Sequence, residues 1–209
     1  MKIKTIFLDF EGVISHNGQF IHTTVYDLVK NKMTYEEANT RYSKARVSDI
    51  NFEEFEKDFP KSWIEKSLNK LILHKGAKKF LDWSKGKYPL FIASNNVPIL
   101  CEKEIDKLEV RDYFDKLFIS CYMKKRKPND DFFEELLKET KNPLPALFVD
   151  DAKKNLLTAK KFGFTTVWVN NSKTVLREDK RNLIDYKPDY EITDLMELKK
   201  ILKELEEKD

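Results

Sequence analysis

The sequence predicts an α/β fold, a doubly wound parallel β-sheet with helices on both faces and a helical insertion. Short apolar runs alternate with helix-like segments along most of the chain, and this alternation indicates a parallel sheet covered on both sides. Residues 16–72 differ, because they contain helical patterns and nothing that resembles a buried strand. These two observations predict one sheet-based core with a helical unit inserted near its start.

The fold is expected to be organised around the segment Lys4 to Val13, KTIFLDFEGV. Ile6, Phe7 and Leu8 form a continuous apolar run, which suits a strand buried on both faces, and Asp9 stands where that strand ends. Similar runs predict strands at Tyr88–Ala93, Lys116–Ser120, Ala146–Val149, Thr165–Val169 and, at the sheet edge, Tyr190–Ile192.

Helix-like segments separate these runs. Gly76 and Gly86 bracket one of them, and Pro128 is expected in the first turn of another, where proline is tolerated. The predicted core helices are those from Gly76 to Gly86, Val97 to about Val110, Pro128 to about Glu139, Ala152 to Phe162, and a last amphipathic helix from Thr193.

We assign residues 16–72 to a helical insertion and residues 1–15 and 73–209 to the core. Thr34 and Glu37 form a capping-box pattern, which predicts a helix ending near Arg46. The turn after Val13 predicts a small hairpin or an irregular flap. Helical patterns also cover Thr23–Lys32, the segment from Asn51 to Pro60, and Lys61–Leu71.

Composition excludes several classes of protein. The chain has 209 residues with 39 basic and 36 acidic side chains, and a net charge of +3 does not indicate a nucleic-acid-binding protein. No apolar run approaches the ~18 residues that span a membrane. Cys101 and Cys121 form no metal or disulfide pattern and are expected to be buried apolar residues in a reducing compartment. The cytoplasm is the expected location.

Polar residues follow directly on several predicted strands. Asp9, Ser94 and the Asp150-Asp151 pair each stand at such an end. Since the carboxyl ends of neighbouring parallel strands meet at one edge of a sheet, these side chains are expected to converge there, where ligands of α/β folds bind. One such residue alone is usually turn or helix-capping chemistry, but three endings together favour a functional site.

Four segments carry a resemblance to a known family: IFLDFEGV, LFIASNN, the Lys127-Pro128 of KKRKPNDDFF, and LFVDDAKKNLLTAKKFGF. Their order and character resemble the haloacid dehalogenase-like hydrolase superfamily, specifically its phosphatase members, and imply a Rossmann-like core. The long interval between Asp9 and Ser94, compared with the short one between Ser94 and Lys127, resembles members whose small helical cap lies between the first two motifs.

The resemblance implies a Mg²⁺-dependent phosphatase of a small phosphorylated metabolite. Asp9 matches the family nucleophile, which forms an aspartyl-phosphate. The implied Mg²⁺ ligands are the Asp9 carboxylate, the Glu11 backbone carbonyl and the Asp150 carboxylate, with Asp151 acting through water or as a supporting partner.

The remaining implied residues handle the phosphate. Ser94 would donate its hydroxyl to a phosphate oxygen, and the Asn95 amide could do the same. Lys127 would pair with both the phosphate and the nucleophile, although a solvated lysine is the alternative interpretation. Asn155 is expected to orient a neighbour by hydrogen bonding rather than to bind metal.

Glu11 departs from the family pattern, which has Asp as the general acid and base at this position. Glu keeps a carboxyl group but reaches further, and a misplacement of about 1 Å can cost about 10²-fold in rate. Dehalogenase members lack an acid at this position and need no metal, so Glu11 and the Asp150-Asp151 pair argue against a dehalogenase. We expect Glu11 to be a working but altered acid and base.

The cap offers further candidates. Arg41, Lys44 and Arg46 could meet an acidic substrate group, although such a run is more often a solvated helix face. His16 lies where a flap could touch substrate, but a surface histidine is the simpler interpretation. Trp63 is expected in the cap core.

Three functional hypotheses remain open from sequence. The first is the phosphatase, the second a mutase-like enzyme that transfers a phosphoryl group to a sugar hydroxyl, and the third a degenerate binding or regulatory protein, which only Glu11 favours. The expected partner is a small phosphorylated metabolite, with no nucleic acid and no membrane. The chain is expected to be a monomer or a homodimer.

Overall fold

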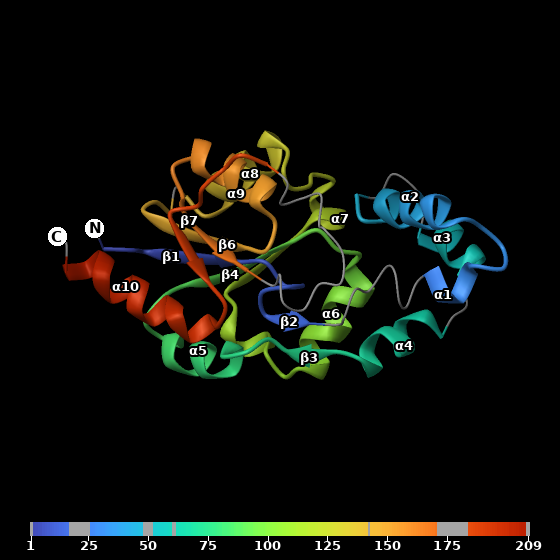
Figure 1. Cartoon of the computed structure of the whole chain (residues 1–209), viewed down its shortest axis with the longest axis horizontal. Coiled ribbons are helices and arrows are strands. Elements are labelled where there is room, and N and C mark those ends of the chain that lie inside the picture. The colour runs from blue at the N-terminus through green and yellow to red at the C-terminus, as the bar shows by residue number, and fades with distance from the viewer. Residues whose placement is uncertain are drawn as a thin grey trace.

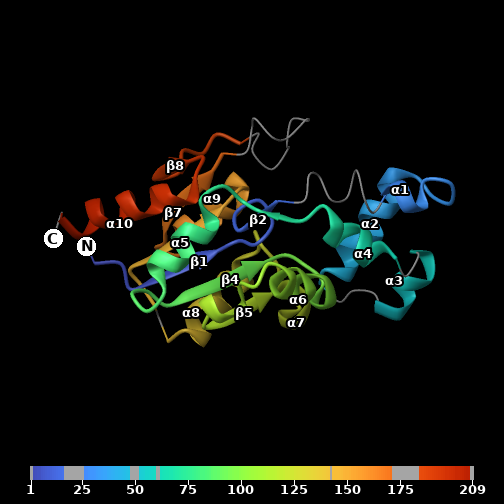
Figure 2. The same cartoon turned by 90° about the horizontal axis from the view of Figure 1, so that it is seen from below.

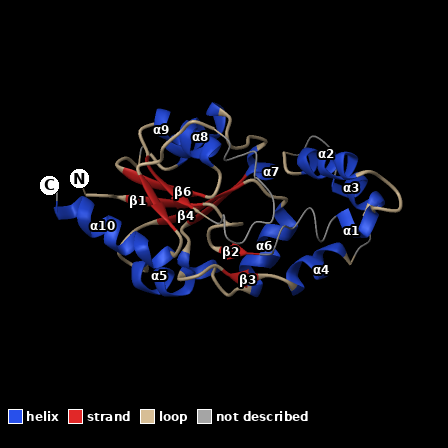
Figure 3. Ribbon diagram, viewed as in Figure 1, coloured by secondary structure: helices blue, strands red, loops and turns tan. Residues whose placement is uncertain are grey.

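We describe a computed structural model of the chain over residues 2–16, 26–47, 52–59, 62–141, 143–170 and 184–207. The core of the fold is a parallel sheet, whose strands are drawn as arrows in Figures 1 and 3. It has six strands in the order β5-β4-β1-β6-β7-β8. The predicted fold class is therefore confirmed. The strands are β1 (Thr5–Leu8), β4 (Leu90–Ser94), β5 (Lys116–Ile119), β6 (Ala146–Asp150), β7 (Thr165–Val169) and β8 (Tyr190–Ile192).

The first strand is central because its side chains are apolar on both faces. Ile6 and Leu8 pack with the helices of one face, whereas Phe7 packs among phenylalanines on the other. In register, Leu8 pairs with Ile92 of β4 on one side and with Val149 of β6 on the other. The chain winds outward in both directions from β1, so the edge beyond its carboxyl end is where the strand order reverses.

Helices cover both faces of the sheet. On one face lie α5 (Ala77–Ser84), α6 (Pro98–Lys107) and α10 (Leu198–Glu207), whose apolar side chains join the cluster around Ile6 and Leu8. On the other face lie α8 (Asp130–Glu139) and α9 (Lys153–Lys161), around Phe7 and Phe148 (Figure 1). Short 3₁₀ turns occur at Arg111–Tyr113 and Leu195–Glu197.

The inserted unit contains α1 (Tyr26–Val29), α2 (Tyr35–Ala45), α3 (Phe52–Asp58) and α4 (Trp63–Asn69), and it lies beyond one end of the sheet (Figures 1 and 2). A two-stranded ribbon of β2 (Ser15–His16) and β3 (Ile72–Leu73) lies where the chain leaves and rejoins the core. The helices share an aromatic core in which Phe55 contacts both Phe59 and Trp63. Part of the predicted flap, Gly18 included, lies outside the described residues.

The predicted capping box of α2 is present. The Thr34 hydroxyl accepts a hydrogen bond from the Glu37 backbone N–H, and the Glu37 carboxylate accepts one from the Thr34 N–H at 2.7 Å. Asn51 and Pro60, which bound another predicted helical segment, lie outside the described residues.

Other local predictions were wrong or incomplete. Pro128 is not in the first turn of α8, because Asn129 caps a helix that begins at Asp130. Proline also fits the position two residues before the helix, because it has no backbone N–H that would need a hydrogen-bond partner. Cys101 is buried as expected, but Cys121 is partly exposed because it lies on the single-turn helix α7 (Ser120–Met123), which the sequence did not predict. None of the helices described here is long and apolar enough to cross a bilayer.

Candidate active site

The predicted strand-end residues meet at the carboxyl edge of the sheet. Asp9 follows β1, while Ser94 and Asp150 are the last residues of β4 and β6, the two neighbours of β1. Lys127 reaches the same place from the loop between α7 and α8. All four side chains are buried, as expected when adjacent strands bring their ends together beneath covering loops.

Lys127 bridges two carboxylates. Its Nζ lies 2.9 Å from Asp9 Oδ2 and 2.7 Å from Asp150 Oδ2, and the residue is only 1 % exposed. The interpretation as a solvated lysine is therefore wrong. Burial alone would lower the pKa of Lys127, but the charges of Asp150 and Asp9 outweigh it and hold that pKa above its usual value. The group is a fixed cation.

Asp150 is held from several sides. The Asn155 amide, in the first turn of α9, donates to both carboxylate oxygens at 3.0 and 3.1 Å. The Ala152 backbone N–H donates to Oδ1 at 2.8 Å. With the Lys127 ammonium, these donors fix the carboxylate orientation, and Asn155 has the orienting contacts that we expected.

Asp9 is in a different environment. Its Oδ1 accepts a hydrogen bond of 2.7 Å from the Phe10 backbone N–H, while Oδ2 faces Lys127. Burial raises the pKa of Asp9 to about 7, with the charges of Asp150 and Asp151 acting in the same direction and that of Lys127 opposing them. A positive ligand beside these carboxylates would favour ionised Asp9.

Asp9, Asp150 and Asp151 form an acidic group whose nearest carboxylate oxygens lie within 4.8 Å of one another. Hard oxygen donors of this kind suit Mg²⁺. Gly12, at φ +84°, lies so close to Asp151 that an added Cβ would be 2.6 Å from Oδ2. The residues present therefore fit a small divalent cation, and the position of Asp151 depends on a glycine opposite it.

Asn95 is engaged with the lysine loop. Its side-chain Nδ2 donates to the Lys127 carbonyl at 2.8 Å, and its Oδ1 accepts from the Lys127 backbone N–H at 2.9 Å. Both ends of this amide therefore hold the Lys127 main chain. Its neighbour Ser94 takes no part in these two hydrogen bonds and is 2 % exposed at the end of β4.

Glu11 lies in a tight turn directly after Asp9. The turn is closed by hydrogen bonds from the Ile14 and Ser15 N–H groups to the Phe10 carbonyl, both at 2.9 Å, and by Gly12 N–H to Ser15 O at 2.8 Å. Glu11 is partly buried, and its charge contributes to raising the pKa of Tyr42 on the inserted helix α2. Glu11 thus lies between the strand end and the helical unit.

Sequence reasoning missed three residues around this site. Trp168 on β7 donates from its indole N–H to the Asp151 carbonyl at 3.0 Å. Tyr42 and Asn96 form a hydrogen bond across the boundary between the inserted unit and the core. The sequence offered two signals for these residues, the aromatic side chain near the end of β7 and the second asparagine of SNN. Neither signal alone indicates which residue would be its hydrogen-bond partner.

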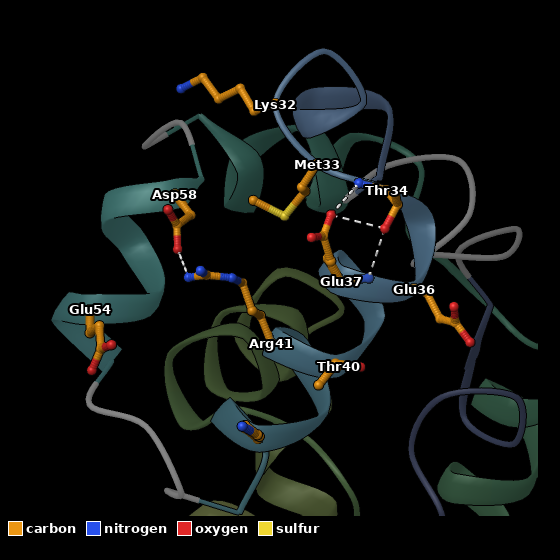
Figure 4. A pocket seen from close by; sticks show the side chains of 10 residues that line it. Lys32, Met33, Thr34, Glu36, Glu37, Thr40, Arg41, Glu54 and Asp58 are labelled. Carbon is orange, nitrogen blue, oxygen red and sulfur yellow. Dashed lines mark hydrogen bonds and ion pairs between the residues drawn. The ribbon is translucent and has the colours of Figure 1, made fainter.

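The candidates of the inserted unit are not among these converging side chains. Arg41 and Lys44 line a pocket of about 720 Å³ on the inserted unit together with Glu37, Glu54 and other mainly charged residues (Figure 4). Arg41 forms an ion pair with Asp58 across this pocket. None of the predicted catalytic residues lines it. His16 is on β2, and partial burial, together with His74, lowers its pKa.

Asp9 should make stability depend on pH in metal-free buffer. Its pKa rises on folding from about 3.9 to about 7, so the folded state binds the extra proton and loses stability as pH rises through that interval. We expect the free energy of unfolding of wild type, relative to Asp9→Asn, to fall between pH 4 and pH 7. Urea denaturation of both proteins with EDTA measures this, and a constant difference would contradict the assigned environment.

Gly12→Ala should displace Asp151. Gly86 provides the matched control, because it also has a positive φ, +73°, but an added Cβ there would meet nothing within 4 Å. Both substitutions cost backbone strain, whereas only Gly12→Ala adds overpacking, which typically costs about 1–3 kcal/mol. Urea denaturation of the two variants measures the difference, and equal losses would show that Asp151 accommodates the methyl group freely.

Comparison with known proteins agrees with this geometry. Residues 6–169 match the family model described as haloacid dehalogenase-like hydrolase. The chain is 26% identical over 198 residues to the D-ribitol-5-phosphate phosphatase of Bacteroides thetaiotaomicron, covering 81% of this chain and 93% of that protein. It is 32% identical over 98 residues to the pyrimidine 5′-nucleotidase YjjG of Escherichia coli, covering 46% of this chain and 44% of that protein.

Solved structures share the fold. One is a family enzyme from Bacteroides thetaiotaomicron, an aspartate-to-alanine variant in complex with magnesium and inorganic phosphate. It superposes with a TM-score of 0.69 at 20% identity and covers 85% of this chain and 97% of its own. The resemblance found in the sequence is thereby confirmed: the chain belongs to the haloacid dehalogenase-like hydrolase family, as a phosphatase-type member.

Proposed function

We propose that the protein is a Mg²⁺-dependent phosphatase that cleaves a small phosphorylated metabolite through a phosphoryl group on Asp9. The observation that carries this proposal is the Lys127 ammonium held between Asp9 and Asp150 at the edge where β1 and β6 end. The names of the two curated relatives, a sugar-phosphate phosphatase and a nucleotidase, support a phosphomonoester as substrate.

The residues that would hold the metal are Asp9, Asp150 and the Glu11 carbonyl, with Asp151 bound directly or through water. Bound there, Mg²⁺ would offset the repulsion between the nucleophile and the phosphate dianion. The magnesium and phosphate bound by the solved relative support this assignment. The Lys127 ammonium neutralises charge on Asp9 and, in this account, also pairs with the phosphate.

In the first step, an Asp9 carboxylate oxygen attacks phosphorus and the bond to the leaving oxygen breaks. Glu11 donates a proton to that oxygen, so the alcohol leaves neutral. Glu11, now a carboxylate, then takes a proton from the water that attacks the phosphoryl group, and Asp9 is released with inorganic phosphate. Ser94 donates its hydroxyl to a phosphate oxygen in both steps.

Two assignments are refined by the contacts around the site. Asn95 is proposed to position Lys127, because both of its amide atoms bond to the Lys127 main chain. The cap is proposed as residues 16–72, whose α1 to α4 lie beyond the sheet edge that carries Asp9. Substrate selection is then proposed to be a property of this cap.

Hydrolysis of a generic aryl phosphate, with and without Mg²⁺, tests the function. We expect release of phosphate that requires Mg²⁺ and is abolished by Asp9→Asn, because the amide is a poor nucleophile. The exposed Asp112→Asn is the matched control and should keep wild-type activity. A folded wild type that hydrolyses no phosphomonoester but captures beryllium fluoride at Asp9 would instead favour a binding protein.

Glu11 is tested by two substitutions. Glu11→Gln keeps the size but cannot transfer a proton, and loss of general acid–base catalysis typically costs about 10²–10⁴-fold in rate. Glu11→Asp keeps the carboxyl group and should retain more activity than Glu11→Gln. Measured kcat values decide the point, since a Glu11→Gln enzyme as fast as wild type would remove Glu11 from the mechanism.

A further inference from the structure

The inserted helix α2 is joined to the core by a buried polar network. The Tyr42 hydroxyl donates to Asn96 Oδ1 at 3.2 Å. Near the end of the same helix, the Arg46 carbonyl accepts a hydrogen bond of 2.6 Å from Ser120 Oγ, and that oxygen accepts one of 3.1 Å from the Asn96 backbone N–H. Helix α2 therefore meets the core at two points, and Asn96 takes part in both.

Asn96 is itself fixed by the core. Its Oδ1 also accepts from the Val97 N–H at 2.8 Å, and its Nδ2 donates to Glu104 of α6 at 3.3 Å. Asn96, Glu104 and Ser120 are fully buried, and Tyr42 is 1 % exposed. Because buried polar groups are costly to leave without partners, this network favours one docked arrangement of α2 over many loose ones.

The residue before Asn96 holds the catalytic lysine. Asn95 bonds to both the N–H and the carbonyl of Lys127, and the Lys127 ammonium contacts Asp9. Three consecutive residues therefore serve three places: residue 94 lies at the proposed phosphate site, residue 95 bonds to the main chain of Lys127, and residue 96 bonds to α2. A shift of α2 that pulls on Asn96 moves the backbone that carries Asn95.

Tyr42 is suited to act as a permanent donor in this contact. Burial, and next the charge of Glu11, raise the pKa of its hydroxyl well above the ordinary value, so the group stays protonated. The Arg46 guanidinium lies over the Tyr42 ring, 5.1 Å from its centre.

We propose that Tyr42 and Asn96 form a latch that couples docking of the cap to the placement of Lys127 beside Asp9. Both are positioning residues, and the inference rests on the proposed phosphatase function. When α2 is docked, the latch holds the Lys127 ammonium beside the Asp9 carboxylate. When the Tyr42–Asn96 contact opens, this alignment is lost.

Tyr42→Phe tests the latch, because it removes only the hydroxyl. Tyr26→Phe is the matched control, since Tyr26 packs edge to face on Tyr35 within the cap at 5.6 Å. Misplaced catalytic groups lower the rate of the chemical step, so we expect Tyr42→Phe to lower kcat for the aryl phosphate about tenfold. The control should keep the wild-type kcat. Weaker capture of beryllium fluoride should accompany the lower kcat.

Asn96→Ser provides a second, independent variant. If the two residues act through one contact, the kcat of the double variant should be no lower than that of the less active single variant. If the contact only stabilises the fold, its loss would lower the melting temperature and leave kcat of the folded protein unchanged. Wild-type kcat in both single variants would overturn the latch, whereas an inactive wild type would overturn the phosphatase proposal together with it.

Discussion

The buried ammonium of Lys127 between Asp9 and Asp150 is the interaction on which the rest of the site depends. A buried charge is stable only when it is paired and hydrogen-bonded, because its desolvation cost is large. Removing Lys127 would leave two buried carboxylates without the cation that lies between them. The fold must therefore hold two strand ends and one loop in register at the same time, and it does so with β1, β6 and the loop before α8.

The surrounding contacts serve that requirement. Asn155 and the Ala152 N–H fix Asp150, while Asn95 fixes the Lys127 main chain. Asp9 has fewer contacts than Asp150, with one oxygen bonded to the Phe10 N–H and one facing Lys127. This division suits a site in which one carboxylate reacts and the others support charge.

The strand framework could be predicted from sequence because both faces of a parallel sheet are buried, so IFL and ALFV had to be continuous apolar runs. The convergence of Asp9, Ser94 and Asp150 followed from strand adjacency alone. Helix α7 and strand β3 could not be predicted, because a single turn and a two-residue strand leave no periodic pattern. The Tyr42–Asn96 contact joins residues that are distant in sequence, and only the packing of the inserted unit against the start of α6 brings them together.

The central claim is that the phosphoryl group passes through Asp9. An aryl oxide leaves without protonation, so Glu11→Gln should slow mainly the second step with an aryl phosphate, and the intermediate should accumulate. Rapid acid quenching during turnover, followed by peptide mass spectrometry, measures this directly. The account predicts one phosphoryl group on Asp9 in Glu11→Gln, and none in Asp9→Asn. A phosphoryl group on another residue of a turning-over enzyme would contradict it.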